Sequence, residues 1–440
     1  MSVESIAHPA RQAIGIRWII LGLIVAASFA SYLLRTNLSI VGETMITDLG
    51  MSEFQLGMVF SAFAAGYAIF QFPGGIFGDK IGPRLAITII AIGWGVLTIA
   101  TGLIPGSDVF SVTSVVVTLI AVRFLVGAFH APIFPVTGAG AISNWFPVGG
   151  WGLPNGLSST GLTLGAAATA PVVVWLMDAF GWRQSFFFTA PVAFLIAAVW
   201  WWYVRDYPKQ HPHVGERELE LIDAGRPAPE SAQKEKGTWK LVLKNRDIQL
   251  LTVSYFCMNY VFYLFFNWFF FYLVDVRGFG AHEAGSLTAA QWIVGAIGAT
   301  LGGLTCDRII RRLGLRWGSR MLPLVGLTLC AVFLYAGASS AGPYLTVVFL
   351  SICFGCTQVT EAAYWSTAIA VAGRHAAAAG GVMNTGGNVV GFVGGMLVPF
   401  TASHFGWDTA IATGSIFALI GALLWLFVRA DRPMVISGNP

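Results

Sequence analysis

Long apolar stretches recur along this chain, separated by short polar segments. Each stretch is close to the roughly 20 residues that an α-helix needs to cross the hydrocarbon core of a membrane. The pattern predicts twelve spans, near residues 18–41, 54–78, 84–104, 111–135, 153–177, 185–204, 248–274, 284–305, 321–339, 343–372, 377–400 and 407–428. We therefore expect an all-α polytopic membrane protein with twelve transmembrane helices.

One long polar segment, residues 205–246, interrupts this series after the sixth span. It divides the chain into an N-terminal half, residues 1–204, and a C-terminal half, residues 247–440. Within the segment, Gly-Glu-Arg-Glu-Leu-Glu-Leu-Ile at 215–222 is typical of a short amphipathic helix on the membrane surface. The expected organisation is two six-helix halves joined by a linker loop.

The composition agrees with a membrane location. Of the 440 residues, 56% are hydrophobic and only 10% are charged, whereas soluble domains carry about 25% charged residues. The five cysteines lie in apolar stretches without the additional ligands that a metal site needs, so we expect them to pack rather than form disulfides. We expect no cofactor, no bound metal and no nucleic-acid partner.

Lysine and arginine residues concentrate in alternate loops. If both termini lie on one side, 21 of the 25 basic residues fall on that side, and only Arg183 and Arg277 fall on the other. Because basic residues mark the cytoplasmic side, we expect both termini in the cytoplasm. The remaining two, Arg35 and Arg123, lie inside predicted spans.

The two halves also repeat each other in sequence. The segment at 74–80 recurs at 302–308, an offset of 228, and Phe-Gly-Trp at 180–182 recurs at 405–407, an offset of 225. Duplicated halves are typical of secondary transporters, in which the substrate binds near the midplane between the repeats. The repeat therefore predicts a transporter with a central site.

Several segments resemble the major facilitator superfamily. The loop Gly-Gly-Ile-Phe-Gly-Asp-Lys-Ile-Gly-Pro-Arg at 74–84 is similar to the signature loop of that superfamily. Arg35-Thr-Asn-Leu-Ser, Arg123-Phe-Leu-Val-Gly and Asn384-Thr-Gly-Gly-Asn resemble its anion:cation symporter family, which includes bacterial sugar-acid transporters and vesicular glutamate and sialic acid carriers. The resemblance covers nearly the whole chain. It implies the major facilitator fold and transport of a small organic anion by alternating access.

Two positions depart from this resemblance. Proton-coupled bacterial members usually carry an acidic residue just before the first-span arginine and a glutamate seven residues after the fourth-span arginine. Here these positions hold Leu34 and His130. Proton symport therefore does not follow from the resemblance alone.

Ionisable residues are costly inside a membrane span and indicate a functional site there. A guanidinium stays charged, and its planar fork fits a carboxylate or phosphate. We therefore expect Arg35 and Arg123 to bind an anionic substrate. The alternatives are a structural arginine bonded to backbone carbonyls and, for Arg123, a place in a gating network.

Polar and aromatic residues on other spans complete the expected site. Tyr32 lies one helical turn from Arg35, and the seventh span is unusually aromatic, so that much of it is expected to face lipid or the membrane interface. The amides of the eleventh span either contact the substrate or join helices. The candidate substrate contacts are Tyr32, Tyr67, Tyr263, Asn267, Trp365, Asn384 and Asn388.

Two residues are candidates for ion coupling. Glu361 lies in the middle of the tenth span, where a carboxyl group either pairs with a cation or binds a proton. His130 lies two turns from Arg123 on the same helix face and can titrate near physiological pH. A fixed ion pair for Glu361 and a neutral, hydrogen-bonded His130 are the competing interpretations.

The resemblance further implies a gating role for charged residues at the span ends. In the N-terminal half these would latch the cytoplasmic ends of the helices when the transporter faces outward, and their counterparts would do so more weakly in the C-terminal half. The gating candidates are Asp79, Lys80, Arg84, Asp307 and Arg308.

These observations favour a secondary active transporter of a small carboxylate, such as a sugar acid or aromatic acid, with ion-coupled symport. An exchanger of organophosphates or organic anions is the alternative, and a non-transporting receptor or sensor is an alternative of another class. An enzyme would need a nucleophile–base pair or a metal cluster, for which His130 and Glu361 alone are thin support. The expected partners are the substrate anion, a coupling proton or sodium ion and the lipid bilayer, with a monomeric protein in an inner or plasma membrane.

Overall fold

The structure, a computed structural model, describes residues 15–106, 109–147, 152–223, 242–372, 376–432 and 434. Within these residues, twelve helical segments are long and apolar enough to cross a membrane. The described part of the chain is otherwise made of short helices and turns, without a β-strand. The predicted all-α architecture of twelve spans is confirmed.

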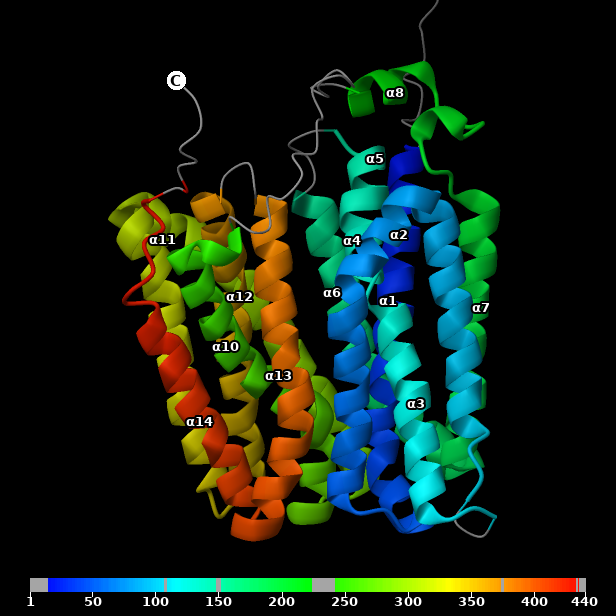
Figure 1. Cartoon of the computed structure of the whole chain (residues 1–440), viewed down its shortest axis with the longest axis vertical. Helices are drawn as coiled ribbons and strands as arrows, with labels where there is room; N and C mark the ends of the chain where they lie inside the picture. Colours follow the sequence, from blue (N-terminus) through cyan, green and yellow to red (C-terminus); the bar gives the residue numbers. More distant parts are fainter. Residues whose placement is uncertain are drawn as a thin grey trace, which may run out of the picture.

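The N-terminal half begins with two long helices, of which the first crosses the bundle once and the second crosses it twice (Figure 1). After the third long helix the chain forms a short, irregular stretch that includes a π-helix at Val136–Ile142. The α-helices of this half are α1 (Ile16–Leu49), α2 (Glu53–Gly102), α3 (Val112–His130), α4 (Ile133–Pro135), α5 (Ser143–Trp145), α6 (Gly152–Phe180) and α7 (Trp182–Tyr203).

The C-terminal half follows the same plan with fewer interruptions. Its first helix ends in a π-helical turn at Tyr272–Val276. The helices of this half are α10 (Arg246–Phe271), α11 (Ala281–Ala338), α12 (Pro343–Ala372), α13 (Ala376–Phe405) and α14 (Trp407–Leu424).

Each of the two longest helices contains two membrane spans joined at a glycine. In α2 the join is Gly82, with φ of 81°, and in α11 it is Gly314, with φ of 74°. Residues with a side chain rarely adopt positive φ, whereas glycine does so readily. Gly181 and Gly406, with φ of 89° and 85°, likewise precede α7 and α14. The internal repeat thus appears in the backbone conformation as well as in the sequence.

The segment between the halves carries α8 (Glu216–Asp223), which matches the helix expected at 215–222. The Glu218 carboxylate accepts hydrogen bonds from the backbone N–H groups of Ile16 and Arg17, both at 3.1 Å. These bonds hold α8 beside the start of α1 (Figure 1). We call this end of the bundle, where α1 begins and α14 ends, the loop end, and the opposite end the far end.

The two halves meet between the level of Arg35 and the far end. Near the far end the Ser61 hydroxyl donates to the backbone carbonyl of Phe392 (2.7 Å), which joins α2 to α13. On the other side of the bundle, Asp178 of α6 pairs with His282 of α11 (2.5 Å). The described hydrogen bonds, ion pairs and ring contacts between the halves all lie in this part of the bundle.

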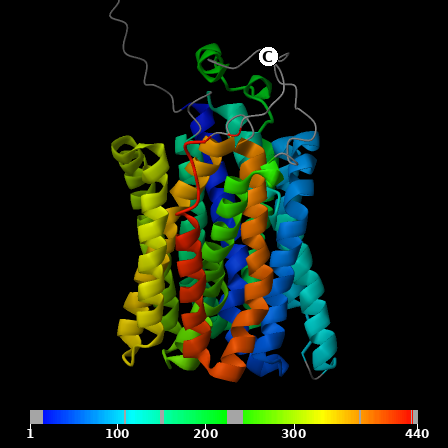
Figure 2. The ribbon, with the colours of Figure 1, turned by 60° about the vertical axis from the view of Figure 1, so that its left-hand side comes forward.

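The aromatic residues of α10 lie in the protein interior. In the most apolar window of this span 89% of the residues are buried, compared with 33% to 61% in the other spans. The helix runs between α13 and α14 (Figure 2) and also packs against α12 and α1. The expectation that much of this span faces lipid is therefore wrong, because its place among its neighbours, and not its composition, decides what it faces.

Candidate substrate site

Arg35 lies near the middle of α1 with only 5% of its surface exposed. Aromatic rings from three helices surround its guanidinium. The Cζ atom lies 5.2 Å from the ring centroid of Tyr32, 4.9 Å from Phe63, 5.3 Å from Tyr67 and 4.6 Å from Phe266. Ring faces attract a cation at these distances. They stabilise the buried charge without neutralising it.

Hydrogen bonds connect Arg35 to the other half of the protein. Its guanidinium donates to the hydroxyls of Tyr32 (3.4 Å) and Tyr263 (3.3 Å). The Tyr263 hydroxyl in turn donates to the Asn388 side-chain carbonyl (2.8 Å), and the Asn388 amide donates to the Asn384 backbone carbonyl (2.7 Å). The structure therefore brings together residues of α1, α10 and α13 that the sequence analysis assigned to one site.

Arg123 of α3 lies beside Arg35 and is 4% exposed. Its guanidinium donates to the backbone carbonyl of Arg35 (3.3 Å), and its Cζ lies 5.2 Å from the Phe63 ring centroid. The Nε atoms of both arginines are buried without a hydrogen-bond partner. In the described part of the chain, no carboxylate lies within 4.0 Å of either guanidinium.

The two positive charges therefore repel each other in a poorly hydrated interior. Because both guanidiniums lie about 5 Å from the centre of the same ring, they are no more than about 10 Å apart. At that distance two like charges repel by about 1.7 kcal/mol with an effective dielectric constant of about 20. A bound anion would relieve this repulsion, and the orphaned Nε–H groups offer it donors.

A small cavity of about 10 Å³ lies between the two arginines and the C-terminal half. A space of that size holds about one water molecule. Its lining includes Asn267, which the sequence analysis named as a candidate contact, together with three phenylalanines and a serine that it did not single out. The lining residues are Arg35, Ser39, Phe60, Phe63, Arg123, Tyr263, Phe266 and Asn267.

His130 lies next to this site in a box of aromatic rings. Its ring centroid lies 5.8 Å from that of Phe63, 6.2 Å from that of Tyr67 and 5.1 Å from that of Trp94. The side chain is 2% exposed, and its Nε2 atom has no hydrogen-bond partner. Its ring centroid also lies 6.3 Å from that of Tyr32, so the histidine shares three of the rings that surround Arg35.

Glu361 lies apart from the arginines. Its Oε1 atom accepts hydrogen bonds from the Tyr255 hydroxyl (2.8 Å) and from the Trp365 indole N–H (2.7 Å). Tyr255 is eight residues before Tyr263 on α10, and eight helical residues span about 12 Å. Glu361 and Trp365 thus form a second polar cluster toward the loop end, and no ion pair joins Glu361 to an arginine among the described residues.

The gating candidates lie at the loop end. The guanidinium of Arg84 donates to the backbone carbonyl of Trp201 (2.7 Å) in the N-terminal half, and its backbone N–H donates to Asp206 (2.8 Å) at the start of the linker. Lys80 and Arg308 are exposed. The side chains of Asp79 and Asp307 lie outside the described set, so the latch between the halves stays a prediction.

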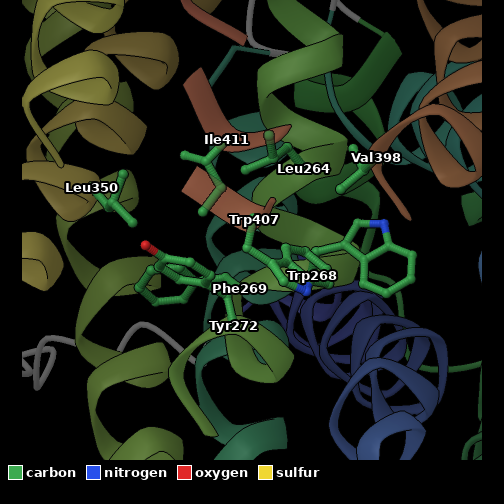
Figure 3. Close-up of a pocket in the computed structure, with 8 residues that line it drawn as sticks. All are labelled: Leu264, Trp268, Phe269, Tyr272, Leu350, Val398, Trp407 and Ile411. Atoms are coloured by element: carbon green, nitrogen blue, oxygen red, sulfur yellow. The ribbon is translucent and has the colours of Figure 1, made fainter. Parts of the chain in front are cut away.

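A second cavity of about 10 Å³ lies near the far end of the C-terminal half (Figure 3). Aromatic and aliphatic side chains of α10, α12, α13 and α14 and of the π-helical turn after α10 line it, and it contains no charged group. Its lining residues are Leu264, Trp268, Phe269, Tyr272, Leu350, Val398, Trp407 and Ile411. This is a packing defect in the core, and the charged site lies at Arg35 and Arg123.

Comparison with known proteins identifies the family. The sequence profile of the Major Facilitator Superfamily matches residues 24–395. The chain is 32% identical to a probable sulfoacetate transporter of Cupriavidus necator, over 98% of this chain and 97% of that protein. It is 30% identical to a probable galactarate/D-glucarate transporter of Bacillus subtilis, over 94% and 93% of the two chains.

Solved structures agree on the fold. A bacterial homologue of the human lysosomal transporter Spinster, in an inward-facing and occupied conformation, superposes with a TM-score of 0.76 at 17% identity, over 94% of this chain and 96% of that one. A D-xylose–proton symporter superposes with a TM-score of 0.76 at 13% identity, over 95% and 99%. These relatives and folds are those of transporters and not of enzymes. The chain is therefore a multi-pass membrane protein that belongs to the major facilitator superfamily.

Proposed function

We propose that this protein is a secondary active transporter of a small organic anion. The observation that carries the proposal is the pair of buried guanidiniums, Arg35 and Arg123, which lack a carboxylate partner among the described residues and face a cavity between the halves. The relatives support it, because their names specify sulfoacetate and galactarate or glucarate, all of which are organic anions.

In this proposal the halves, residues 1–204 and 247–440, move against each other around the site, with residues 205–246 as the linker. Tyr32 and Tyr67 would orient the anion from the N-terminal half, and Tyr263, Asn267, Asn384 and Asn388 from the C-terminal half. The protein would lie in an inner or plasma membrane as a monomer with both termini in the cytoplasm. The contacts at the far end would then close its outer side.

Net uptake of an anion needs an energy source. Moving one negative charge inward against a negative-inside potential costs about 2.3 kcal/mol per 100 mV. Glu361 and His130 are the coupling candidates, and Glu361 has the better geometry because it is partly exposed and linked by Tyr255 to the helix that carries Tyr263. The coupling ion would be a proton or sodium.

Anion exchange is the second candidate function. It is favoured by one observation, the absence of a carboxylate within 4.0 Å of Arg35 and Arg123 in the described residues, since an exchanger needs no proton site beside its substrate. Uptake into proteoliposomes distinguishes the two functions. A symporter takes up the anion without an anion inside the vesicles, whereas an exchanger needs one.

The test combines binding and transport. Purified protein is heated with a panel of carboxylates, sulfonates and phosphate esters, because a ligand that binds the folded state raises the unfolding temperature. Stabilising compounds are then assayed for uptake into proteoliposomes. Arg35→Ala should abolish both effects, whereas Arg183→Ala, which removes a far-end arginine paired with Asp48, should preserve both. Stabilisation by neutral compounds only, or retained in Arg35→Ala, would refute the proposal.

A further inference from the structure

The charge at the arginine site allows a narrower statement about the substrate. Arg35 and Arg123 bring two positive charges to the Phe63 ring, at 4.9 Å and 5.2 Å from its centre. Within the described residues no carboxylate lies within 4.0 Å of either group. Charge balance at the site therefore has to come from the substrate.

The one acidic group in the middle of the spans does not supply this balance. Glu361 is held by Tyr255 and Trp365. Tyr255 lies two turns of α10, about 12 Å, from Tyr263, which contacts Arg35. His130, which contacts the rings of Phe63 and Tyr67, adds no negative charge. A substrate with one negative charge would leave one guanidinium uncompensated, whereas a substrate with two would match both.

The remaining lining offers little to a substrate hydroxyl. Phe60, Phe63 and Phe266 contribute no hydrogen-bonding group, so besides the arginines, Ser39 and Tyr263 the lining offers a substrate hydroxyl only the Asn267 amide. The hydroxyl protons of Ser39 and Tyr263 are already donated, to the Thr36 backbone carbonyl (2.6 Å) and to Asn388 (2.8 Å). A buried hydroxyl without a partner costs binding free energy. A substrate with several hydroxyl groups therefore fits this site worse than a substrate without hydroxyls.

We propose that the substrate is a small dianion, with two ionised acidic groups joined by a short chain that carries few or no hydroxyls. The class comprises short dicarboxylates and sulfocarboxylates, and it leaves out polyhydroxylated sugar acids. One acidic group pairs with Arg35 and the other with Arg123, and the methylene chain packs on Phe63. This inference rests on the proposed function and specifies the substrate of the same site.

Four kinds of probe separate charge from hydroxyl content. Binding to the purified full-length protein is measured by calorimetry for sulfoacetate and succinate (bare dianions), galactarate (a hydroxylated dianion), propionate (a bare monoanion) and galactonate (a hydroxylated monoanion). We expect sulfoacetate or succinate to bind at least tenfold more tightly than the other three. This comparison of probes uses only the wild-type protein.

A substitution that changes the charge at the site provides the second test. His130 contacts the rings of Phe63 and Tyr67, so His130→Glu places a carboxylate beside the arginines. We expect it to weaken succinate or sulfoacetate at least tenfold while propionate keeps or gains affinity. His130→Gln, of similar size and neutral, should keep the ratio of dianion to monoanion affinity.

The outcomes distinguish the two proposals. Tight binding of a monoanion that is lost in Arg35→Ala would overturn the dianion inference and leave anion transport standing. Preference for galactarate over both bare dianions would overturn the restriction on hydroxyls. Binding of no anion in the panel, or binding that survives Arg35→Ala, would overturn the proposed function together with the inference.

Discussion

Gly57 controls how closely the two halves approach at the far end. A Cβ atom on Gly57 of α2 would lie 2.8 Å from Cγ of Pro399 on α13, and closer still to the backbone oxygen of Gly395. Ordinary contacts of a Cβ begin at 3.4 Å. The substitution Gly57→Ala must therefore push α2 and α13 apart by at least about 0.6 Å, because neither a backbone carbonyl nor a proline ring can turn away.

The size of the effect follows from that overlap. Overpacking by one methyl group costs about 1–3 kcal/mol, and here the cost applies only to the state in which the far end is closed. A difference of about 1–3 kcal/mol changes an equilibrium about 5- to 150-fold. We therefore expect Gly57→Ala to shift the population toward a state in which the far ends of the halves separate.

The assay is a distance measurement between spin labels on the two halves. Thr47 of α1 and Ser403 of α13 are exposed near the far end and suit double electron–electron resonance. Gly57→Ala should add or enlarge a population at longer distance. The matched control is Gly303→Ala in α11, where an added Cβ meets nothing within 4 Å, and its distances should equal those of the wild type.

An unchanged distance distribution in Gly57→Ala, in protein that unfolds at the wild-type temperature, would refute this reasoning. It would mean that the helices absorb the methyl group without separating. A lower unfolding temperature with no long-distance population would show that overpacking destabilises the fold instead of shifting its conformation.

Three further predictions address single contacts. Tyr263→Phe removes the hydroxyl that joins Arg35 to Asn388 and should destabilise this state by about 1.5–3 kcal/mol, the usual range for a hydrogen bond to a charged group; unchanged thermal unfolding would contradict it. Glu361→Gln keeps the shape of the side chain and should abolish the dependence of uptake on an ion gradient while calorimetric binding persists; gradient-driven uptake in the variant would exclude Glu361 as the coupling group. Asp178→Asn breaks the ion pair with His282, but both side chains are more than half exposed, so the free energy of unfolding should change by less than about 1 kcal/mol; a larger loss in chemical denaturation would show that the pair is a major latch.

The sequence predicted the architecture because span length and basic residues are strong signals along a chain. It also singled out Arg35 and Arg123 as candidate substrate contacts, since an arginine inside an apolar span is unusual whatever its neighbours are. It did not predict Phe60, Phe63 or Phe266, because a phenylalanine in a span can face lipid or the interior equally well. The close approach at Gly57 could not be predicted from the sequence for a similar reason. The chain has 52 glycines, and only the packing of α2 on α13 distinguishes this one.

The bond between Arg35 and Tyr263 has a consequence for the rate of the proposed transport cycle. In this structure a guanidinium of one half is held by a hydroxyl of the other, and this bond must break before the halves can separate there. An arriving anion competes for the same N–H group and so releases the other half. The unloaded carrier should then reorient more slowly than the loaded one, and anion placed on the opposite side of the membrane should accelerate uptake.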